Sequence, residues 1–388
     1  MRKKYVLVLS GGGFRAAFQL GVLNFLAKHW KALTGKDTPM HFDIIAGVSA
    51  GSLNGALLAM GKLDRLNQFW QGVATEGTDM IYTSPFFKTV GDRLVMDVDS
   101  KELKDLLFRD FKIDKPFRTL LKFLVNRNEA MTDLLSSAIK SGSSNFSNLK
   151  SVADNAPLYK ILLEELRTQD IKNTQYICGC VSLDDGKYHA TRHTDFHNDT
   201  DFAKAVLAST SMPVVWKPVD GVNGNLKNLV DGGIRNVSPL ADVIKLMNEA
   251  QEDVEYEVFI INCANGENLN VNAQDYNIAQ IAFRSLYDIT FAEIFSNDLE
   301  QFLQVNDLVK QAKAAGIELR HYSTKDGKRT TRKLKDFKTY IIQPPSGIDL
   351  GDSLVGSKEM INKRIKAGYT EAQRLFKKKE NNLPVSVV

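Results

Sequence analysis

The chain has 388 residues, of which 43% are apolar and 25% are charged, the composition of an ordinary globular protein. Its 50 lysines and arginines nearly balance 46 aspartates and glutamates, and the net charge of +4 gives no support for a nucleic-acid partner. The cysteines, Cys178, Cys180 and Cys263, are odd in number and lack metal-ligand spacing, so we expect small buried thiols in a cytoplasmic protein rather than disulfides.

Two apolar stretches imitate targeting or membrane segments. Residues 5–9 are too few for the apolar region of a signal peptide, and they end in glycines. Residues 44–61 carry no charge, but their four glycines and their change from strand-like to helix-like composition favour a buried strand, turn and helix. We therefore expect neither a signal peptide nor a membrane span.

The N-terminal part predicts a βαβ unit. A β-branched strand, a glycine loop, an amphipathic helix and a second buried strand follow one another at residues 5–10, 11–13, 14–30 and 42–46. A helix of small and apolar residues then runs to Met60, and residues 63–73 continue as helix. This order makes the sheet parallel at its start.

Residues 75–158 differ in character, and we interpret them as a helical insertion or lid over the core. They contain the aromatic residues Tyr82, Phe86 and Phe87, which look exposed, and helical or apolar runs at 101–111 and 116–127.

After the insertion the pattern of the core resumes. We expect a helix at 159–167, a hairpin of 174–183 with 187–192, a helix at 202–209, a strand at 226–230, a helix from Pro239 and the last core strand at 257–262. Long helices over 276–315, an antiparallel strand pair within 320–342 and a terminal helix at 357–379 follow. Residues 1–245 would form the catalytic core, and 246–388 a continuation of the same domain.

The motif Gly47-Val48-Ser49-Ala50-Gly51 lies where the second strand passes into its helix, as in a nucleophile elbow. Glycines on both sides let strand and helix pass close to the serine, and the positive end of the helix favours an anionic intermediate. Because such five-residue matches are common by chance, Ser49 needs support from the rest of the chain.

The loop Gly11, Gly12 and Gly13 is the candidate oxyanion hole, because its N–H groups can approach a ligand oxygen at a helix start. Arg15 follows in the first turn and could hold this loop or the anionic head of a substrate. The loop also fits a dinucleotide-binding fingerprint loosely, but that site needs an acidic residue at the end of the second strand, and Asp43 stands at its beginning. A tight turn without a ligand is a further alternative.

Histidines make poor candidates for the base of Ser49. His321 is the only histidine well downstream, and its polar neighbourhood predicts a surface side chain. His189, His193 and His197 are evenly spaced but have no carboxylate motif beside them, so we expect no metal site.

A carboxylate at a strand end is the better candidate. Asp231 follows an expected strand and precedes Gly232 and Gly233, which places it at the carboxyl edge of the sheet. Burial in an apolar cleft would raise its pKa towards that of a useful base. Taken alone, Asp-Gly-Gly is more often a hairpin turn.

In this order, GGGFR at 11–15, GVSAG at 47–51 and DGG at 231–233 resemble the patatin-like phospholipases. The resemblance covers residues 1 to about 245 and departs at Ala16, where that family usually has a further glycine. It implies a three-layer α/β/α fold with a mainly parallel central sheet, no cofactor, and a Ser-Asp dyad that hydrolyses fatty-acyl esters of glycerolipids. Ser49 would be the nucleophile, Asp231 the base, and Gly11 to Gly13 the oxyanion hole.

We therefore expect a lipid acyl hydrolase of the phospholipase A or lysophospholipase type that forms an acyl-Ser49 intermediate. Acyl transfer to an alcohol other than water, and a non-catalytic lipid- or partner-binding protein, stay open as alternatives. Because a lipid ester is held in a bilayer, peripheral membrane contact is expected, and the amphipathic run at 116–127 is the candidate docking segment. Packing of that run on the core is an equal alternative.

Overall fold

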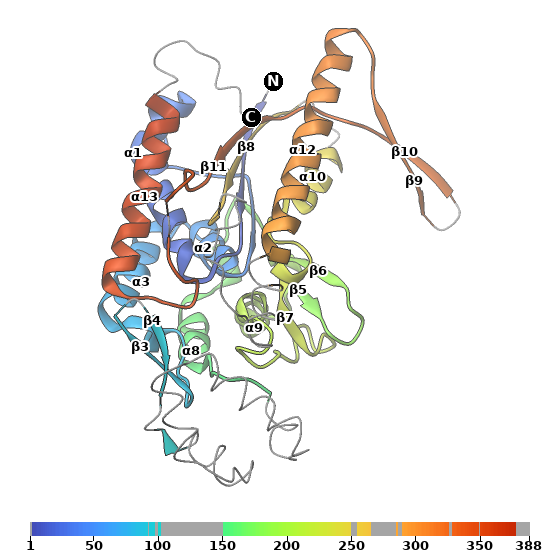
Figure 1. Cartoon of the computed structure of the whole chain (residues 1–388). Helices are drawn as coiled ribbons and strands as arrows, with labels where there is room; N and C mark the ends of the chain where they lie inside the picture. Colours follow the sequence, from blue (N-terminus) through green and yellow to red (C-terminus); the bar gives the residue numbers. More distant parts are fainter. Residues whose placement is uncertain are drawn as a thin grey trace.

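The computed structural model describes residues 2–91, 93–97, 100–101, 150–249, 254–264, 285, 289–325, 328–348 and 350–377. They build a central seven-stranded sheet with helices on both faces (Figure 1). The strands are β1 (Arg2–Leu9), β2 (Ile44–Val48), β5 (Gln175–Ser182), β6 (Tyr188–Arg192), β7 (Leu229–Asp231), β8 (Val254–Ile261) and β11 (Lys338–Ile342).

The sheet has the order β11-β8-β1-β2-β5-β6, and β7 pairs with β5 beside this path. The strands from β11 to β5 run parallel, whereas β6 and β7 run antiparallel to β5. Strand β2 is buried along its whole length, as expected for a strand covered on both faces. The predicted parallel start and the hairpin of β5 with β6 are confirmed.

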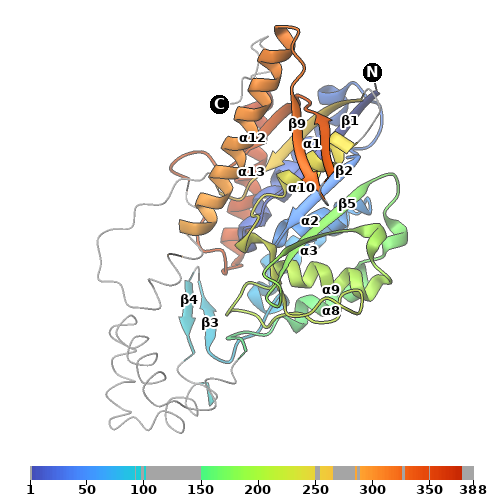
Figure 2. The same cartoon turned by 90° about the vertical axis from the view of Figure 1, so that its right-hand side faces the viewer.

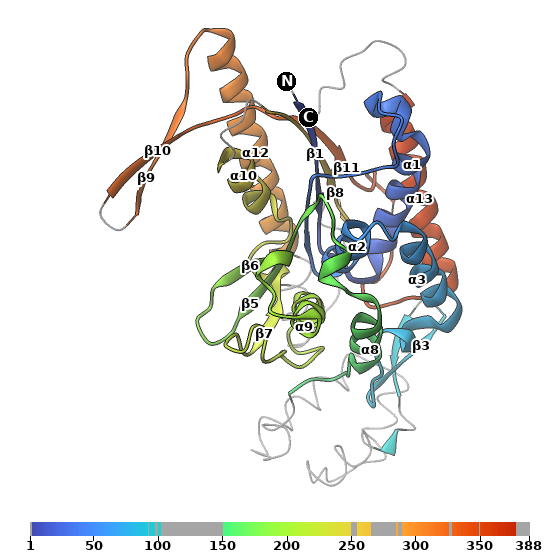
Figure 3. The ribbon, with the colours of Figure 1, turned by 180° about the vertical axis from the view of Figure 1, so that it is seen from behind.

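Helices form the two outer layers (Figures 1 and 3). One face carries α1 (Ala17–Thr34), α2 (Ala50–Ala59), α3 (Leu63–Glu76), α8 (Ala156–Glu165), α9 (Asp199–Thr210) and α13 (Lys358–Lys377). The other face carries α10 (Leu240–Glu249) and α12 (Phe291–Ala314). The expected three-layer α/β/α architecture is thus confirmed.

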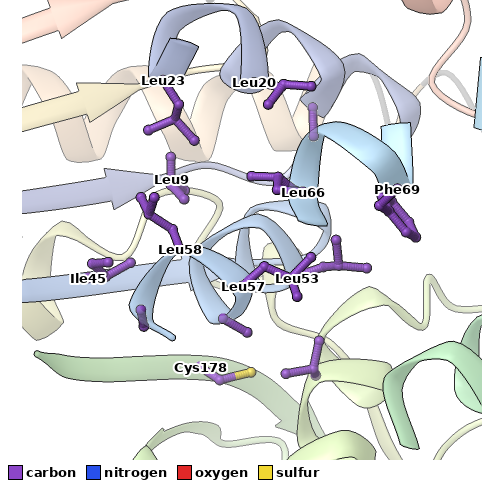
Figure 4. Packing of buried hydrophobic residues seen from close by; sticks show 14 of the residues in the cluster. Leu9, Leu20, Leu23, Ile45, Leu53, Leu57, Leu58, Leu66, Phe69 and Cys178 are labelled. Carbon is purple, nitrogen blue, oxygen red and sulfur yellow. The ribbon is translucent and has the colours of Figure 1, made fainter. Parts of the chain in front are cut away.

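Helix α2 is buried on all sides, because its apolar residues face both the sheet and the neighbouring helices. Leu53, Leu57 and Leu58 lie in one cluster with Leu9 of β1 and Ile45 of β2 (Figure 4). A helix that is apolar all round is stable only inside a core. This burial fixes the helix that begins directly after Ser49.

The C-terminal part corrects one prediction. Residues 320–342 do not form a single strand pair: β9 (Arg320–Lys325) and β10 (Lys328–Lys333) form a projecting hairpin (Figure 1), while β11 joins the central sheet parallel to β8. The prediction that 257–262 is the last core strand is therefore wrong. Alternate apolar residues of β11, Tyr340 and Ile342, are buried in the same cluster as α1, which gives this strand its place in the core.

The segment 75–158 was predicted to be a helical insertion or lid, and the described part at its start differs from this prediction. Helix α3 extends to Glu76, and η2 (Gly77–Met80) leads to a small hairpin of β3 (Phe87–Val90) with β4 (Arg93–Met96), which projects beyond the core (Figure 2). Tyr82 is buried rather than exposed. The helical runs expected at 101–111 and 116–127 lie outside the described residues.

The remaining described elements differ from prediction only at their ends, and the part of the helices predicted over 276–315 that precedes residue 289 lies, apart from residue 285, outside the described residues. The strand expected at 226–230 is β7, so Asp231 is its last residue rather than the residue after it. All three cysteines are buried and free, as expected. Within the described ranges, no helix is both long and apolar enough to cross a membrane.

Candidate active site

Ser49 occupies a strained turn between β2 and α2. Its φ of 56° and ψ of −136° lie in a region that residues other than glycine rarely adopt. Holding the backbone there costs about 1–3 kcal/mol. The turn is held by hydrogen bonds: Ser49 N donates to Ser209 Oγ at 2.9 Å, and Ser49 O accepts from Ser52 N at 2.9 Å and Ser52 Oγ at 2.6 Å. The predicted elbow is present in this geometry.

The two glycines of the elbow are required by close backbone approach. A β-carbon on Gly47 would lie 2.3 Å from Gly51 O, and one on Gly51 would lie 2.5 Å from the carbonyls of Leu9 and Ser10. Strand β2, helix α2 and the end of β1 can therefore meet at Ser49 only if both positions lack a side chain.

Strand register brings Asp231 to Ser49. On β5, Val48 pairs with Gly179 and Asp231 pairs with the next residue, Cys180. Since β6 occupies the other edge of β5, β2 and β7 approach each other end to end along one edge. Ser49, which follows β2, and Asp231, which ends β7, therefore lie next to each other at the carboxyl edge of the sheet.

The Asp231 carboxyl is 2% exposed, and this burial raises its pKa to about 7. The nearby Ser49 hydroxyl and the Gly233 N–H, which donates to Oδ1 at 2.7 Å, act in the opposite direction by stabilising the carboxylate. Gly232 completes the turn, because a β-carbon there would lie 2.5 Å from Gly179 O. A carboxyl with a pKa near neutrality, placed beside a hydroxyl, is suited to accept the proton of that hydroxyl.

The glycine loop lies against Ser49, since a β-carbon on Gly11 would be 3.0 Å from Ser49 Cβ. Gly11 N donates to Val237 O at 3.0 Å, which corrects the expectation that all three N–H groups face a ligand. For the N–H groups of Gly12 and Gly13 the described residues provide no hydrogen-bond acceptor. Gly13 has φ of 53°, a conformation that favours glycine.

The Arg15 side chain contacts a loop in the C-terminal part of the chain. Its Nε donates to Gly351 O at 2.7 Å, which ties the first helical turn to a loop near the C-terminal helix. Arg15 was expected to hold either the glycine loop or the anionic head of a substrate. The contact fits the holding of a loop, but the loop is the one that contains Gly351 and not the glycine loop.

An apolar pocket that no motif of the sequence indicates lies beside Ser49. Residues from the 3-10 turn before α1, from α2, α3 and α8, and from the end of α9 and the segment after it line the pocket, among them Phe14, Leu53, Phe69, Leu158, Met212 and Trp216. Its free volume is ≈ 50 Å³, far below the roughly 300 Å³ of a pocket that encloses a whole ligand. Only a short part of an apolar chain fits without side-chain movement.

The alternative candidates lie elsewhere. His321 is exposed on β9, far along the chain from the elbow, as predicted. His193 Nδ1 accepts from Tyr176 N at 3.2 Å, and His189 Nε2 lies 3.3 Å from the Asp185 carboxylate. In the described ranges no three His, Cys, Asp or Glu side chains are grouped so that they could hold a metal ion.

Asp43, the acid that the dinucleotide interpretation needs at the other end of β2, accepts a hydrogen bond from Tyr5 N at 2.8 Å. Its carboxylate therefore joins the middle of β1 to the amino end of β2, away from the glycine loop. This position does not suit a ribose ligand bound at that loop.

The fold and site define an α/β protein with a buried serine at a strand-to-helix turn and a buried carboxyl at the end of a neighbouring strand. The chain belongs to the patatin-like phospholipase family, whose model matches residues 7–244. The crystal structure of VipD from Legionella pneumophila is similar at a TM-score of 0.38 and 12% identity, over 97% of this chain and 67% of VipD. A comparison with curated proteins finds no match. Membership places the chain among lipid acyl hydrolases at the level of the family.

Proposed function

We propose that this chain hydrolyses fatty-acyl esters of glycerophospholipids, with Ser49 as nucleophile and Asp231 as general base. The observation that carries the proposal is that β2 and β7 bring Ser49 beside a buried carboxyl, that of Asp231, whose pKa is raised to about 7. A base with this pKa is largely ionised just above neutral pH and still basic enough to assist a hydroxyl.

In the first half-reaction, Asp231 accepts the hydroxyl proton while Ser49 Oγ forms a bond to the ester carbonyl carbon. The N–H groups of Gly12 and Gly13 would donate to the oxyanion that develops there, and each such donor is worth roughly 3–4 kcal/mol. The ester C–O bond then breaks, the leaving alcohol takes the proton from Asp231, and the acyl group stays on Ser49.

In the second half-reaction, water attacks the acyl carbon and gives its proton to Asp231. The bond from carbon to Ser49 Oγ breaks, Oγ recovers the proton, and a fatty acid leaves. The apolar pocket beside Ser49 supports an acyl chain as the bound group, since almost all of its lining is apolar.

Acyl transfer is a second candidate, because another alcohol in place of water would give a new ester on the same dyad. Analysis of the products separates it from hydrolysis. The peripheral membrane contact and the docking segment expected at 116–127 stay predictions, since that segment lies outside the described residues.

Labelling by a fluorophosphonate tests the proposal against a non-catalytic binding protein. Wild type should be labelled at Ser49, as located by peptide mass spectrometry, and Ser49→Ala should not be labelled. Equal labelling of both proteins, or none of a folded wild type, would contradict an activated Ser49.

A further inference from the structure

A loop near the C-terminal helix, residues 350–355, has every main-chain carbonyl engaged in a hydrogen bond. The guanidinium of Arg364 donates to three of them: Leu350 O at 2.8 Å, Asp352 O at 2.7 Å and Val355 O at 2.7 Å. Arg364 lies on α13 and is 0% exposed. One buried side chain thus determines the path of the loop.

The other three carbonyls of this loop accept from the region of the active site. Their donors are Arg15 Nε to Gly351 O at 2.7 Å, Phe14 N to Ser353 O at 2.8 Å, and the Tyr82 hydroxyl to Leu354 O at 2.9 Å. Two of these donors belong to the first turn after the glycine loop. The 350–355 loop therefore links α13 to the segment that carries the proposed oxyanion donors.

The contact extends to Gly13 itself. A β-carbon at this position would lie 2.3 Å from Ser353 O, so the loop packs directly on the glycine. Because Ser353 O also fixes the next N–H, that of Phe14, the plane of the Gly13–Phe14 peptide depends on where the loop lies.

We propose that Arg364 is a positioning residue that orients the Gly12 and Gly13 N–H groups through the 350–355 loop. This inference rests on the proposed function, in which those groups bind the oxyanion. It also means that the active site of this chain is completed by residues outside the 7–244 segment that the family model matches.

Helix α13, which carries Arg364, is held in place by close packing against α1. A β-carbon on Gly368 would lie 2.0 Å from Phe18 O, and one on Gly21 would lie 1.9 Å from Ile365 O. Helices α13 and α1 therefore approach at backbone distance, through α13 residues that follow Arg364 directly and α1 residues shortly after the glycine loop. A planar guanidinium presents several donors in a fixed fork, which suits three carbonyls, whereas a lysine ammonium cannot reproduce that fork.

Arg364→Lys and Arg364→Met test the proposal with a soluble short-chain ester. We expect kcat to fall by roughly 10- to 100-fold in both variants, since a displacement of about 1 Å at a reacting centre costs on this order. The Kd of an ether analogue without a carbonyl should stay the same, because the lost geometry matters only for the oxyanion. Lys363→Met is the matched control: it removes a neighbouring exposed charge from the same helix.

All rates are compared well below the melting temperature of each variant, with Ser49→Ala in the same assay. A folded Arg364→Lys protein with kcat within about twofold of wild type would overturn the inference. If Ser49→Ala were active too, the proposed function would fail with it; an inactive Ser49→Ala beside a fully active Arg364→Lys rejects the positioning role alone. A rise in Kd for the ether analogue that accounts for the whole loss of kcat/KM would also reject it.

If neither Arg364 variant folds, Tyr82→Phe decides the question. This change removes only the hydroxyl that donates to Leu354 O and keeps the ring in its contacts with Phe14 and Trp216. A lower kcat at an unchanged Kd for the ether analogue supports the proposal. An unchanged kcat in this folded variant overturns it.

Discussion

The side-chain hydroxyl of Ser209 accepts a hydrogen bond from the main-chain N–H of Ser49 at 2.9 Å. The same hydroxyl donates to Gly179 O at 2.6 Å, on the β5 residue next to the one that pairs with Asp231. Ser209 is fully buried near the end of α9. One hydroxyl therefore ties the strained elbow to the strand that positions the carboxyl.

Ser209→Ala should lower both stability and turnover. The free energy of unfolding should fall by about 1–3 kcal/mol, since the change leaves a buried N–H and a buried carbonyl unpaired. Turnover should fall because the elbow is less well fixed. Chemical denaturation and hydrolysis of a soluble ester measure the two effects.

Ser182→Ala is the control for Ser209→Ala. Its hydroxyl also accepts from a main-chain N–H, that of Asp184, and donates to a carbonyl, that of Lys227. It should lose stability but keep its turnover. If Ser209→Ala behaved in the same way, Ser209 would have no part in holding the elbow.

The raised pKa of Asp231 predicts how activity depends on pH. Because the ionised carboxylate is the base, kcat/KM should rise about tenfold per pH unit up to the pKa of about 7 and level off above it. Initial rates on a neutral soluble ester from pH 5 to pH 9 test this. A profile already level at pH 5 would show an Asp231 pKa close to its ordinary value.

The same raised pKa predicts that the free energy of unfolding falls as pH rises, whereas kcat/KM rises. The folded carboxyl keeps its proton up to about pH 7, whereas an unfolded one loses it near 3.8. In this window the unfolded chain binds fewer protons, so the free energy of unfolding falls as pH rises, by up to about 4 kcal/mol. Asp231→Asn lacks this contribution and should be more stable than wild type at pH 8 and similar to it near pH 4.

Gly12→Ala should lower turnover more than substrate affinity, and a second substitution should reverse this effect. The β-carbon that Gly12→Ala adds would lie 2.4 Å from Cys263 Cβ, so the loop must shift away and carry its N–H groups with it. Adding Cys263→Gly removes the obstacle and should restore a large part of kcat. Cys263→Gly alone is the control, and a double variant as slow as Gly12→Ala would contradict the steric explanation.

Leu53→Phe should change which acyl chains are accepted. Leu53 lines the apolar pocket from α2, and a larger ring there should shift the ratio of kcat/KM towards shorter chains by about tenfold or more, since one methylene in an apolar pocket changes this ratio by roughly 10- to 200-fold. Leu57 is buried on the same helix but does not line the pocket. Leu57→Phe should therefore lower stability by overpacking to a similar extent without changing the preference for chain length. An unchanged chain-length profile in a stable Leu53→Phe protein would show that the chain binds elsewhere.

The sequence predicted the parts of the site that backbone geometry imposes locally. Gly47, Gly51 and Gly13 are required by close approach or by a positive φ, and such requirements leave a visible motif. Asp231 could be inferred because a polar residue at a strand end lies at the sheet edge. The parallel sheet followed from strands that alternate with helices.

Features made by distant segments left no such motif. Ser209 and Arg364 look ordinary in their own helices, and only the folded chain brings them to Ser49 and to the 350–355 loop. Strand β11 was assigned to the preceding hairpin because its short alternating pattern does not reveal its partner. The apolar pocket draws on four helices, so no one stretch of sequence shows it.

Turnover of a soluble short-chain ester at pH 8 by Asp231→Asn, measured beside His321→Ala, tests the Ser49–Asp231 dyad most directly. Asp231→Asn should lose roughly 10²–10⁴-fold in kcat, the usual contribution of a general base, and remain folded. His321→Ala, changed at an exposed residue of the projecting hairpin, should keep wild-type turnover. Near-normal turnover of Asp231→Asn together with an inactive, folded His321→Ala would contradict the dyad and require a histidine base.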